Sequence, residues 1–295
     1  MFAKGVRLSL VLLLAASVAA CAQEPPRPLL WKVSDADNSI YLLGSFHLLK
    51  EDDYPLAPAV EAAFEDAERL VFELPPDAMA DPATGRMMLQ AAQRTDGSRL
   101  REELSKETWE RLEAHARRRN LPLGPMQNMD AWYVGLVVSL TEMQAQGLMP
   151  EHGLDKHFAQ RAVQAGKPAG GLESVAEQIA LFDGLDRELQ VASLEQTLAE
   201  LEDLQARVER MHTLWRAGDA EGLYAMTGAE MKARQPELYA RVNTARNQAW
   251  LPRLKTLLDP PGDEDVLVVV GALHLLGEDG LVALFEAEGY TVERL

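Results

Sequence analysis

The sequence is poor in cysteine, in basic residues and in familiar catalytic signatures, and each shortage narrows what the protein can be. Cys21 is the only cysteine among 295 residues, so an internal disulfide is excluded. The 29 lysines and arginines face 46 aspartates and glutamates, and the net charge of -17 disfavours nucleic acid as a partner. The patterns H-E-x-x-H and G-x-S-x-G and a glycine-rich phosphate loop are absent, which argues against the enzyme classes that they mark.

An apolar run at the N-terminus, LSLVLLLAASVAA, follows a short basic start and is too short to span a bilayer comfortably. The run leads into VAAC, which resembles the bacterial lipobox. We therefore expect residues 1–20 to be a lipoprotein signal peptide and Cys21 to carry the lipid that attaches the protein to a membrane. Residues 21–28 then form a tether, and Ala22 favours an outer-membrane lipoprotein that faces the periplasm. The alternative is an unpaired thiol near a cleavage site.

The order of apolar patterns predicts an α/β fold. The opening indicates a β-hairpin, a helix and a third strand, and the continuous apolar run EDVLVVVGALH indicates a buried strand near the end. The middle has helical periodicity, with one long helix expected over 186–216 and another over 236–258. We therefore expect a central mixed, mostly parallel sheet built from the N- and C-terminal parts, with a large helical insertion in the middle. Residues 29–295 are expected to form a single domain.

One short pattern occurs twice, at opposite ends of the chain. LLGSFHLL contains His47 and VVGALHLL contains His274, and in both an apolar run is followed by Gly-x-x-His and two further apolar residues. The glycine allows a sharp turn just after a strand, and ligands of parallel sheets bind beyond the carboxyl ends of the strands. If the two strands are neighbours, both imidazoles reach one point. The alternative is two unrelated histidines in strand-end loops.

Other polar residues stand where chemistry or structure could use them. Glu73 lies near the end of the apolar strand VFELPP, where a carboxylate is costly to bury unless it is paired or bound to a metal; an exposed edge-strand residue is the alternative. Arg246 lies on a helix with one apolar side, and a solvated helix face is its alternative. We expect Glu173 to serve a helix N-terminus, where negative charge is favoured. His115 and His212 have no evident partner in the sequence.

Several of these segments together resemble the TraB/GumN family, which is grouped with the Tiki proteins and, more distantly, with erythromycin esterases and the ChaN haem-binding lipoproteins. The resemblance extends from about Leu29 to Leu295 and rests on the paired Gly-x-x-His motifs, VFELP, GLDKHF, GLES, ARNQAW and the C-terminal GYTVERL. Three residues depart from the family pattern. Ser45 stands where Thr is usual, Leu273 where Gly is common, and Trp250 where a smaller residue follows Arg-Asn.

The resemblance implies an α/β sheet with both Gly-x-x-His loops at one site and, by analogy with Tiki proteins, metal-dependent hydrolysis of peptides. His47, His274 and Glu73 would bind a divalent metal such as Zn, Mn or Co, which would supply hydroxide from bound water. His47, Glu73 and Arg246 would be the catalytic residues, with Arg246 holding an oxyanion or a substrate carboxylate.

Three alternatives remain open at this point. The site could work without metal, with a histidine as general base oriented by Glu73, as in the esterase relatives. The protein could be a lipoprotein that binds haem or a metal without turnover. It could also be a scaffold that has lost activity, for which Leu273 beside His274 is the argument.

Overall fold

The structure is a computed structural model that describes residues 24–27, 29–258 and 264–295. The expected signal peptide, the lipidation at Cys21 and part of the expected tether lie outside the described residues. Within the described part, no helix is both long and apolar enough to cross a membrane.

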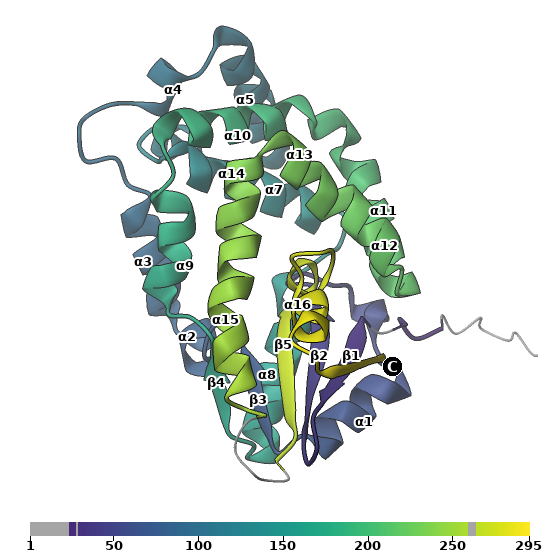
Figure 1. The fold of residues 1–295 in the computed structure, drawn as a ribbon. Helices are drawn as coiled ribbons and strands as arrows, with labels where there is room; N and C mark the ends of the chain where they lie inside the picture. The colour runs from purple at the N-terminus through teal and green to yellow at the C-terminus, as the bar shows by residue number, and fades with distance from the viewer. Residues whose placement is uncertain (1–23, 28, 259–263) are drawn as a thin grey trace, which may run out of the picture.

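A mixed sheet with the strand order β4-β3-β5-β2-β1-β6 forms one end of the molecule (Figure 1). β2, β5, β3 and β4 are mutually parallel, whereas β1 runs antiparallel to both β2 and β6. The predicted α/β class and the mixed, mostly parallel sheet are therefore confirmed. As predicted, the N- and C-terminal parts supply the strands of the sheet, except for β4, which comes from the helical middle. The strands are β1 (Leu30–Ser34), β2 (Ser39–Ser45), β3 (Arg69–Phe72), β4 (Ala169–Gly171), β5 (Val266–Gly271) and β6 (Thr291–Arg294).

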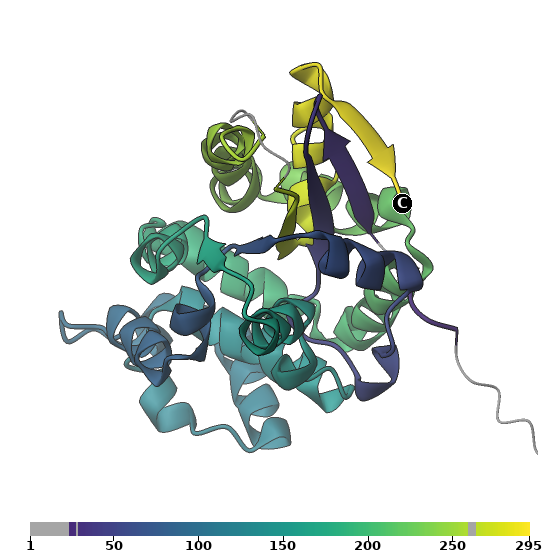
Figure 2. The ribbon, with the colours of Figure 1, turned by 90° about the horizontal axis from the view of Figure 1, so that it is seen from below.

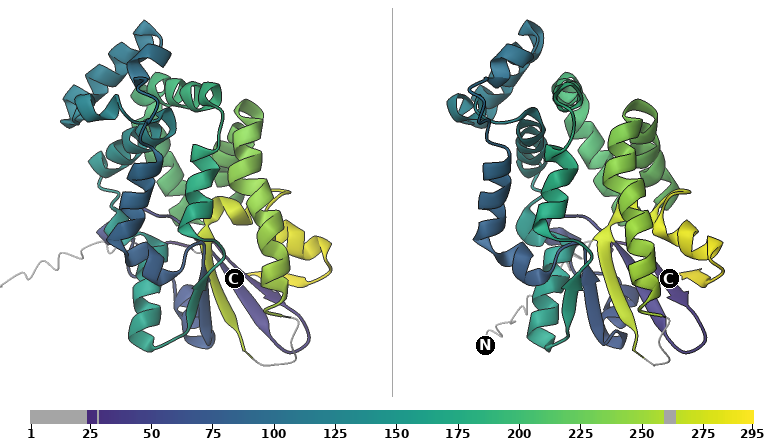
Figure 3. Two further views of the ribbon diagram at one scale, coloured as in Figure 1. Left: turned by 90° about the vertical axis from the view of Figure 1, so that its left-hand side faces the viewer. Right: turned by 60° about the vertical axis from the view of Figure 1, so that its left-hand side comes forward.

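The helical insertion rises over the carboxyl ends of the parallel strands (Figures 1 and 3). Its longer helices are α5, α7, α10 and α11, and a second apolar core lies among α5, α7 and α10. The α-helices are α1 (Pro58–Asp66), α2 (Pro76–Ala80), α3 (Pro82–Ala91), α4 (Leu100–Glu103), α5 (Lys106–Arg119), α6 (Leu123–Met126), α7 (Ala131–Ala145), α8 (Leu154–Ala165), α9 (Val175–Asp183), α10 (Arg187–Ala199), α11 (Leu201–Ala217), α12 (Ala220–Tyr224), α13 (Glu230–Arg234), α14 (Pro236–Tyr239), α15 (Ala245–Lys255) and α16 (Leu281–Ala287).

Helices cover both faces of the sheet. Seen end-on, α1 and α8 lie on one side of the strands and α15 and α16 on the other (Figure 2). Every residue of β2 is buried, and β5 is buried up to its last residue. This double coverage explains the continuous apolar runs of the two strands, because a strand with helices on both faces has no solvent-facing side.

Two of the expected helices differ from the prediction. The long helix over 186–216 is two helices, because α10 ends at Ala199 and α11 starts anew at Leu201. The helix over 236–258 is not uniform either: α14 passes through a π turn, η4 (Ala240–Thr244), into α15. The remaining short turns are the 3₁₀ segments η1 (Glu51–Asp53), η2 (Pro150–His152) and η5 (Ala272–Leu275) and the π turn η3 (Ala225–Ala229).

Candidate active site

The two Gly-x-x-His motifs lie side by side at the carboxyl ends of neighbouring strands. β2 and β5 are paired in parallel, with Ser45 opposite Gly271. A Cβ atom on Gly271 would lie 3.1 Å from Glu73 Oε1, 3.6 Å from His274 Cδ2 and 3.9 Å from His47 Nε2. All three predicted side chains therefore surround the α-carbon of Gly271, and a side chain at this position would crowd them. The structure brings together the residues that the repeated motif and the strand glutamate had suggested.

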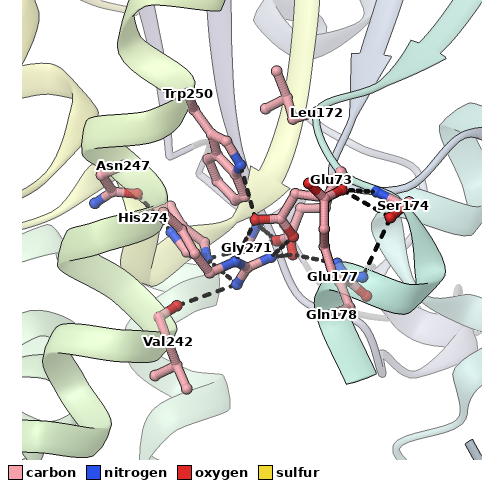
Figure 4. A network of polar contacts seen from close by, with 12 residues as sticks. Glu73, Leu172, Ser174, Glu177, Gln178, Val242, Asn247, Trp250, Gly271 and His274 are labelled. Atoms are coloured by element: carbon pink, nitrogen blue, oxygen red, sulfur yellow. Dashed lines mark hydrogen bonds and ion pairs between the residues drawn. The ribbon is translucent and has the colours of Figure 1, made fainter. Parts of the chain in front are cut away.

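Glu73 is the central carboxylate. It follows β3 directly, its Oε1 accepts a hydrogen bond from the Gly271 amide at 2.7 Å, and its Oε2 accepts one from Arg246 Nη2 at 2.6 Å and one from Gln178 Nε2 at 3.3 Å (Figure 4). Burial opposes ionisation of this carboxyl, but the two histidines and the arginine around it outweigh burial and lower its pKa to about 2. Glu73 is therefore an anion at neutral pH.

The tautomer of His274 follows from its hydrogen bonds. Asn247 donates its Nδ2 to the carbonyl of Asp279 at 2.7 Å, so its Oδ1 is the acceptor for His274 Nδ1 at 2.6 Å. The proton of His274 is thus on Nδ1, and the bare Nε2 accepts a hydrogen bond from Arg246 Nη1 at 2.9 Å. Burial is the main cause that lowers the pKa of His274 to about 3. This ring is neutral, and its lone pair is already engaged.

His47 differs from His274 in exposure and charge. Its side chain is 57% exposed, and its Nδ1 lies 3.2 Å from Asp155 Oδ2. Desolvation disfavours the charged ring, but the Asp155 carboxylate and, more weakly, Glu73 outweigh this and raise the pKa of His47 to about 9. Solvent screens part of this attraction because the ring is more than half exposed. Of the two motif histidines, His47 is the one with an exposed side chain, and no described residue is recorded as a hydrogen-bond partner of its Nε2.

Asp155 reaches His47 because two backbone segments approach closely. Leu154 donates its amide to the carbonyl of Phe46 at 2.9 Å, which fixes the start of α8 beside the first motif. A Cβ atom on Gly153 would lie 2.3 Å from the carbonyl oxygen of His47, so only glycine permits this contact. The sequence analysis did not single out Asp155, although it lies in the GLDKHF segment.

Glu173 is the main residue whose role the sequence analysis mistook. The helix cap expected of it is made by Ser174, which accepts the Glu177 amide at 3.2 Å. The Glu173 carboxylate instead accepts two hydrogen bonds from Arg246, both 2.8 Å long, and one from Trp250 Nε1 at 2.9 Å. Its backbone amide donates to the carbonyl of Glu73 at 2.9 Å, so the β3–β4 pairing places the two acids next to each other.

Arg246 uses all of its donors inside this cluster. A guanidinium has five N–H groups. Nε and Nη2 contact Glu173, Nη2 also contacts Glu73, and Nη1 contacts His274 and the carbonyl of Val242 at 3.2 Å. The side chain is 10% exposed, and Arg246 follows the π turn η4 closely, a turn type frequent at functional sites. An oxyanion role for Arg246 would therefore require one of these contacts to break.

A cavity of about 240 Å³ opens beside the cluster. His47, Asp155, Glu73 and Gln178 supply its polar lining, and its apolar lining comes from Phe72, Leu74, Met79 and Val269. Leu273 does not line this cavity; it approaches Gly228, where an added Cβ would lie 2.6 Å from its Cδ1. A separate cavity of about 400 Å³ between the insertion helices has none of the candidate residues in its lining. The cavity of about 240 Å³ is therefore the one that belongs to the candidate site, because the candidate residues line it.

The predicted metal ligands are not arranged as a metal site. Among the described residues, no group of three His, Cys, Asp or Glu side chains could hold a metal ion. The atoms of His274 and Glu73 that would bind the metal both contact the Arg246 guanidinium, which uses the histidine lone pair and adds a positive charge. The residues as arranged do not fit a divalent metal.

Fold and site together define an α/β protein with an enzyme-like centre of two histidines, two carboxylates and an arginine at the carboxyl ends of its parallel strands. The chain belongs to the TraB/PrgY/gumN family, which it matches over residues 29–294. No solved structure is significantly similar to it.

Relatives in bacteria and animals cover most of the chain. It is 27% identical to the uncharacterized protein YbaP of Escherichia coli strain K12, over 82% of this chain and 85% of YbaP. It is 24% identical to the metalloprotease TIKI1 of Danio rerio and 24% identical to the metalloprotease TIKI homolog of Nematostella vectensis, over 90% and 86% of this chain. The aligned regions span only 62% and 64% of those two relatives.

Proposed function

We propose that this chain is a membrane-anchored hydrolase that cleaves peptides in the cavity beside Gly271, with His47 as general base and without a resident metal. The observation that carries the proposal is the convergence of His47, Glu73 and His274 on one point, with the exposed side chain of His47 lining the cavity. The names of the TIKI relatives support peptides as the substrate class. Of the alternatives drawn from the sequence, this is closest to the metal-free hydrolase, with Asp155 instead of Glu73 as the carboxylate that orients the histidine.

In this mechanism the neutral form of His47 takes a proton from water through Nε2 while the water oxygen attacks the peptide carbonyl carbon. Asp155 orients the ring through Nδ1 and stabilises the imidazolium that forms, and Glu73 adds to that stabilisation. The imidazolium then gives the proton to the leaving amine as the C–N bond breaks, leaving a carboxylic acid and an amine. Gln178 lines the cavity, and its Nε2, which also donates to Glu73, would be the uncharged donor to the carbonyl oxygen.

Peptide cleavage and its pH dependence test the proposal. With a broad peptide library and excess chelator, the wild type should cleave, and kcat/KM should rise with pH, with the midpoint of the rise near the His47 pKa of about 9. Asp155→Asn removes the anion that favours the imidazolium, so the His47 pKa should fall and the rise should move to lower pH by about one unit. A purely structural role for Asp155 would leave the position of the rise unchanged. Absence of any peptide cleavage by the wild type would favour a non-catalytic binding protein.

The proposed location is the periplasmic face of the outer membrane, attached through lipid on Cys21. The VAAC pattern supports this location. A residue that carries two or more acyl chains attaches a protein stably to a membrane. Cys21→Ser should retain residues 1–20 and leave the lipoprotein pool, which metabolic labelling with a clickable fatty acid would show as loss of label. Wild-type protein that takes up no label, or a serine variant labelled as strongly as wild type, would contradict the assignment.

A further inference from the structure

The Arg246 guanidinium is the cation around which the polar groups of the site are organised. It contacts Glu73 at 2.6 Å, Glu173 at 2.8 Å and His274 Nε2 at 2.9 Å, all with a side chain that is 10% exposed. Its Cζ also lies 4.6 Å from the centre of the Trp250 ring. Two carboxylates and a bare imidazole nitrogen around one cation are the donor types that divalent transition metals prefer.

We propose that Arg246 takes the place of a divalent metal: the wild-type centre binds none there, and removing the guanidinium opens a metal site formed by His274, Glu73 and Glu173. This inference shares with the proposed function the absence of a resident metal, and it goes beyond that function by assigning the exclusion of the metal to Arg246. It also adds Glu173, which the sequence analysis had assigned to a helix terminus, to the possible ligands of the site.

Each of the three donors is already held in a ligand-like orientation by a neighbour. Asn247 accepts the Nδ1 proton of His274, which is the outer contact that metal-bound histidines usually make. The Gly271 amide holds Glu73, and Trp250 Nε1 holds Glu173. His274 Nε2 lies 3.9 Å from Glu73 Oε1, not far from the roughly 3.4 Å that separates two ligands of one tetrahedral zinc ion. Small side-chain movements would therefore let His274 and Glu73 share one ion, and Glu173 is linked to both through the guanidinium that the ion would replace.

Charge explains why the guanidinium and a metal exclude each other. The two carboxylates carry two negative charges, of which Arg246 balances one. A metal ion added beside the guanidinium would meet a fixed positive charge within a few ångströms, and it would have to break the Nη1 contact to reach the lone pair of His274. Without Arg246, two largely buried carboxylates would face only the single positive charge of the protonated His47 near Glu73, and the remaining negative charge favours uptake of a divalent cation.

Cobalt binding tests the inference with a readout independent of hydrolysis. The full chain in detergent, stripped with chelator, would be titrated with Co²⁺ while visible absorption and metal content are recorded. We expect less than about 0.1 equivalent at this centre for the wild type and about one equivalent, with new visible bands, for Arg246→Leu. Cobalt should also raise the Tm of Arg246→Leu, and adding His274→Ala to that variant should abolish both effects.

Arg246→Lys is the matched control, because it keeps a positive charge at this position and should bind no cobalt. If Arg246→Leu does not fold, Arg246→Gln offers a polar replacement that can keep one hydrogen bond to the carboxylates. A wild type that binds one equivalent of cobalt, lost on His274→Ala, would overturn the inference. So would failure of both the Leu and the Gln variants to bind cobalt, whatever their state of folding. Cobalt bound by the wild type would also remove the metal-free part of the proposed function, whereas the peptide-cleavage test itself is run in excess chelator and is read separately.

Discussion

Replacing His47 with alanine should lower kcat/KM for peptide cleavage by a factor of about 10²–10⁴, the range that one general base contributes. The other candidate bases cannot substitute for it. The lone pair of His274 accepts a hydrogen bond from Arg246, and the low pKa of Glu73, about 2, makes that carboxylate a weak base. The measurement is steady-state cleavage of one peptide identified with the wild type, in excess chelator, at a pH on the plateau of activity.

The fold should survive this change, because the His47 side chain is 57% exposed and supplies little packing. Equal unfolding transitions for wild type and His47→Ala would show that the loss is chemical. His152→Ala is the matched control: it removes another imidazole near α8, and Tyr54 contacts the His152 backbone carbonyl, which the change keeps. Full activity of His47→Ala would remove the general base from the proposed mechanism.

The sequence was sufficient to predict the parts of the site that depend on local patterns. The apolar runs before each Gly-x-x-His motif are buried strands, and the repetition of the motif correctly indicated that His47 and His274 approach the same point. Glu73 was recognisable because a carboxylate in an apolar strand needs compensation. In each case a few neighbouring residues carry the information.

Roles that depend on distant partners were not visible in the sequence. Glu173 joins the site only because the three-residue strand β4 pairs with β3. So short and glycine-rich a segment predicts a strand only weakly from its sequence pattern. His115 was expected to have no partner, yet it is buried and its Nδ1 lies 3.0 Å from a carboxylate oxygen of Glu142. His212 likewise pairs with Asp53, 159 positions away in the chain. Tertiary packing decides such pairs, and helical periodicity does not encode them.

The pair formed by Asp53 and His212 leads to the largest effect that we expect on stability. Asp53 is fully buried in η1, and its carboxylate accepts hydrogen bonds from His212 Nε2 at 2.8 Å, from the Lys50 amide at 2.8 Å and from Arg216 Nη1. These contacts join the segment after the first motif to α11 of the helical insertion. Asp53→Ala should reduce the free energy of unfolding by about 3–5 kcal/mol, because it leaves buried hydrogen-bonding groups and a guanidinium without their anion.

Urea unfolding followed by tryptophan fluorescence measures this loss, since Trp215 stacks on His212 with ring centroids 6.2 Å apart. Asp52→Ala is the matched control, because that side chain is exposed and the change should cost less than about 0.5 kcal/mol.

The pH dependence of the stability difference provides a second check. Burial opposes ionisation of Asp53, but its hydrogen bonds outweigh burial and lower its pKa in the folded state. The stabilisation is therefore fully present above the unfolded value of about 3.9 and is lost as the pH falls through the folded value. The stability gap between wild type and Asp53→Ala should accordingly narrow in acid, and a gap that is small at neutral pH would show that α11 is held in place by its apolar contacts instead.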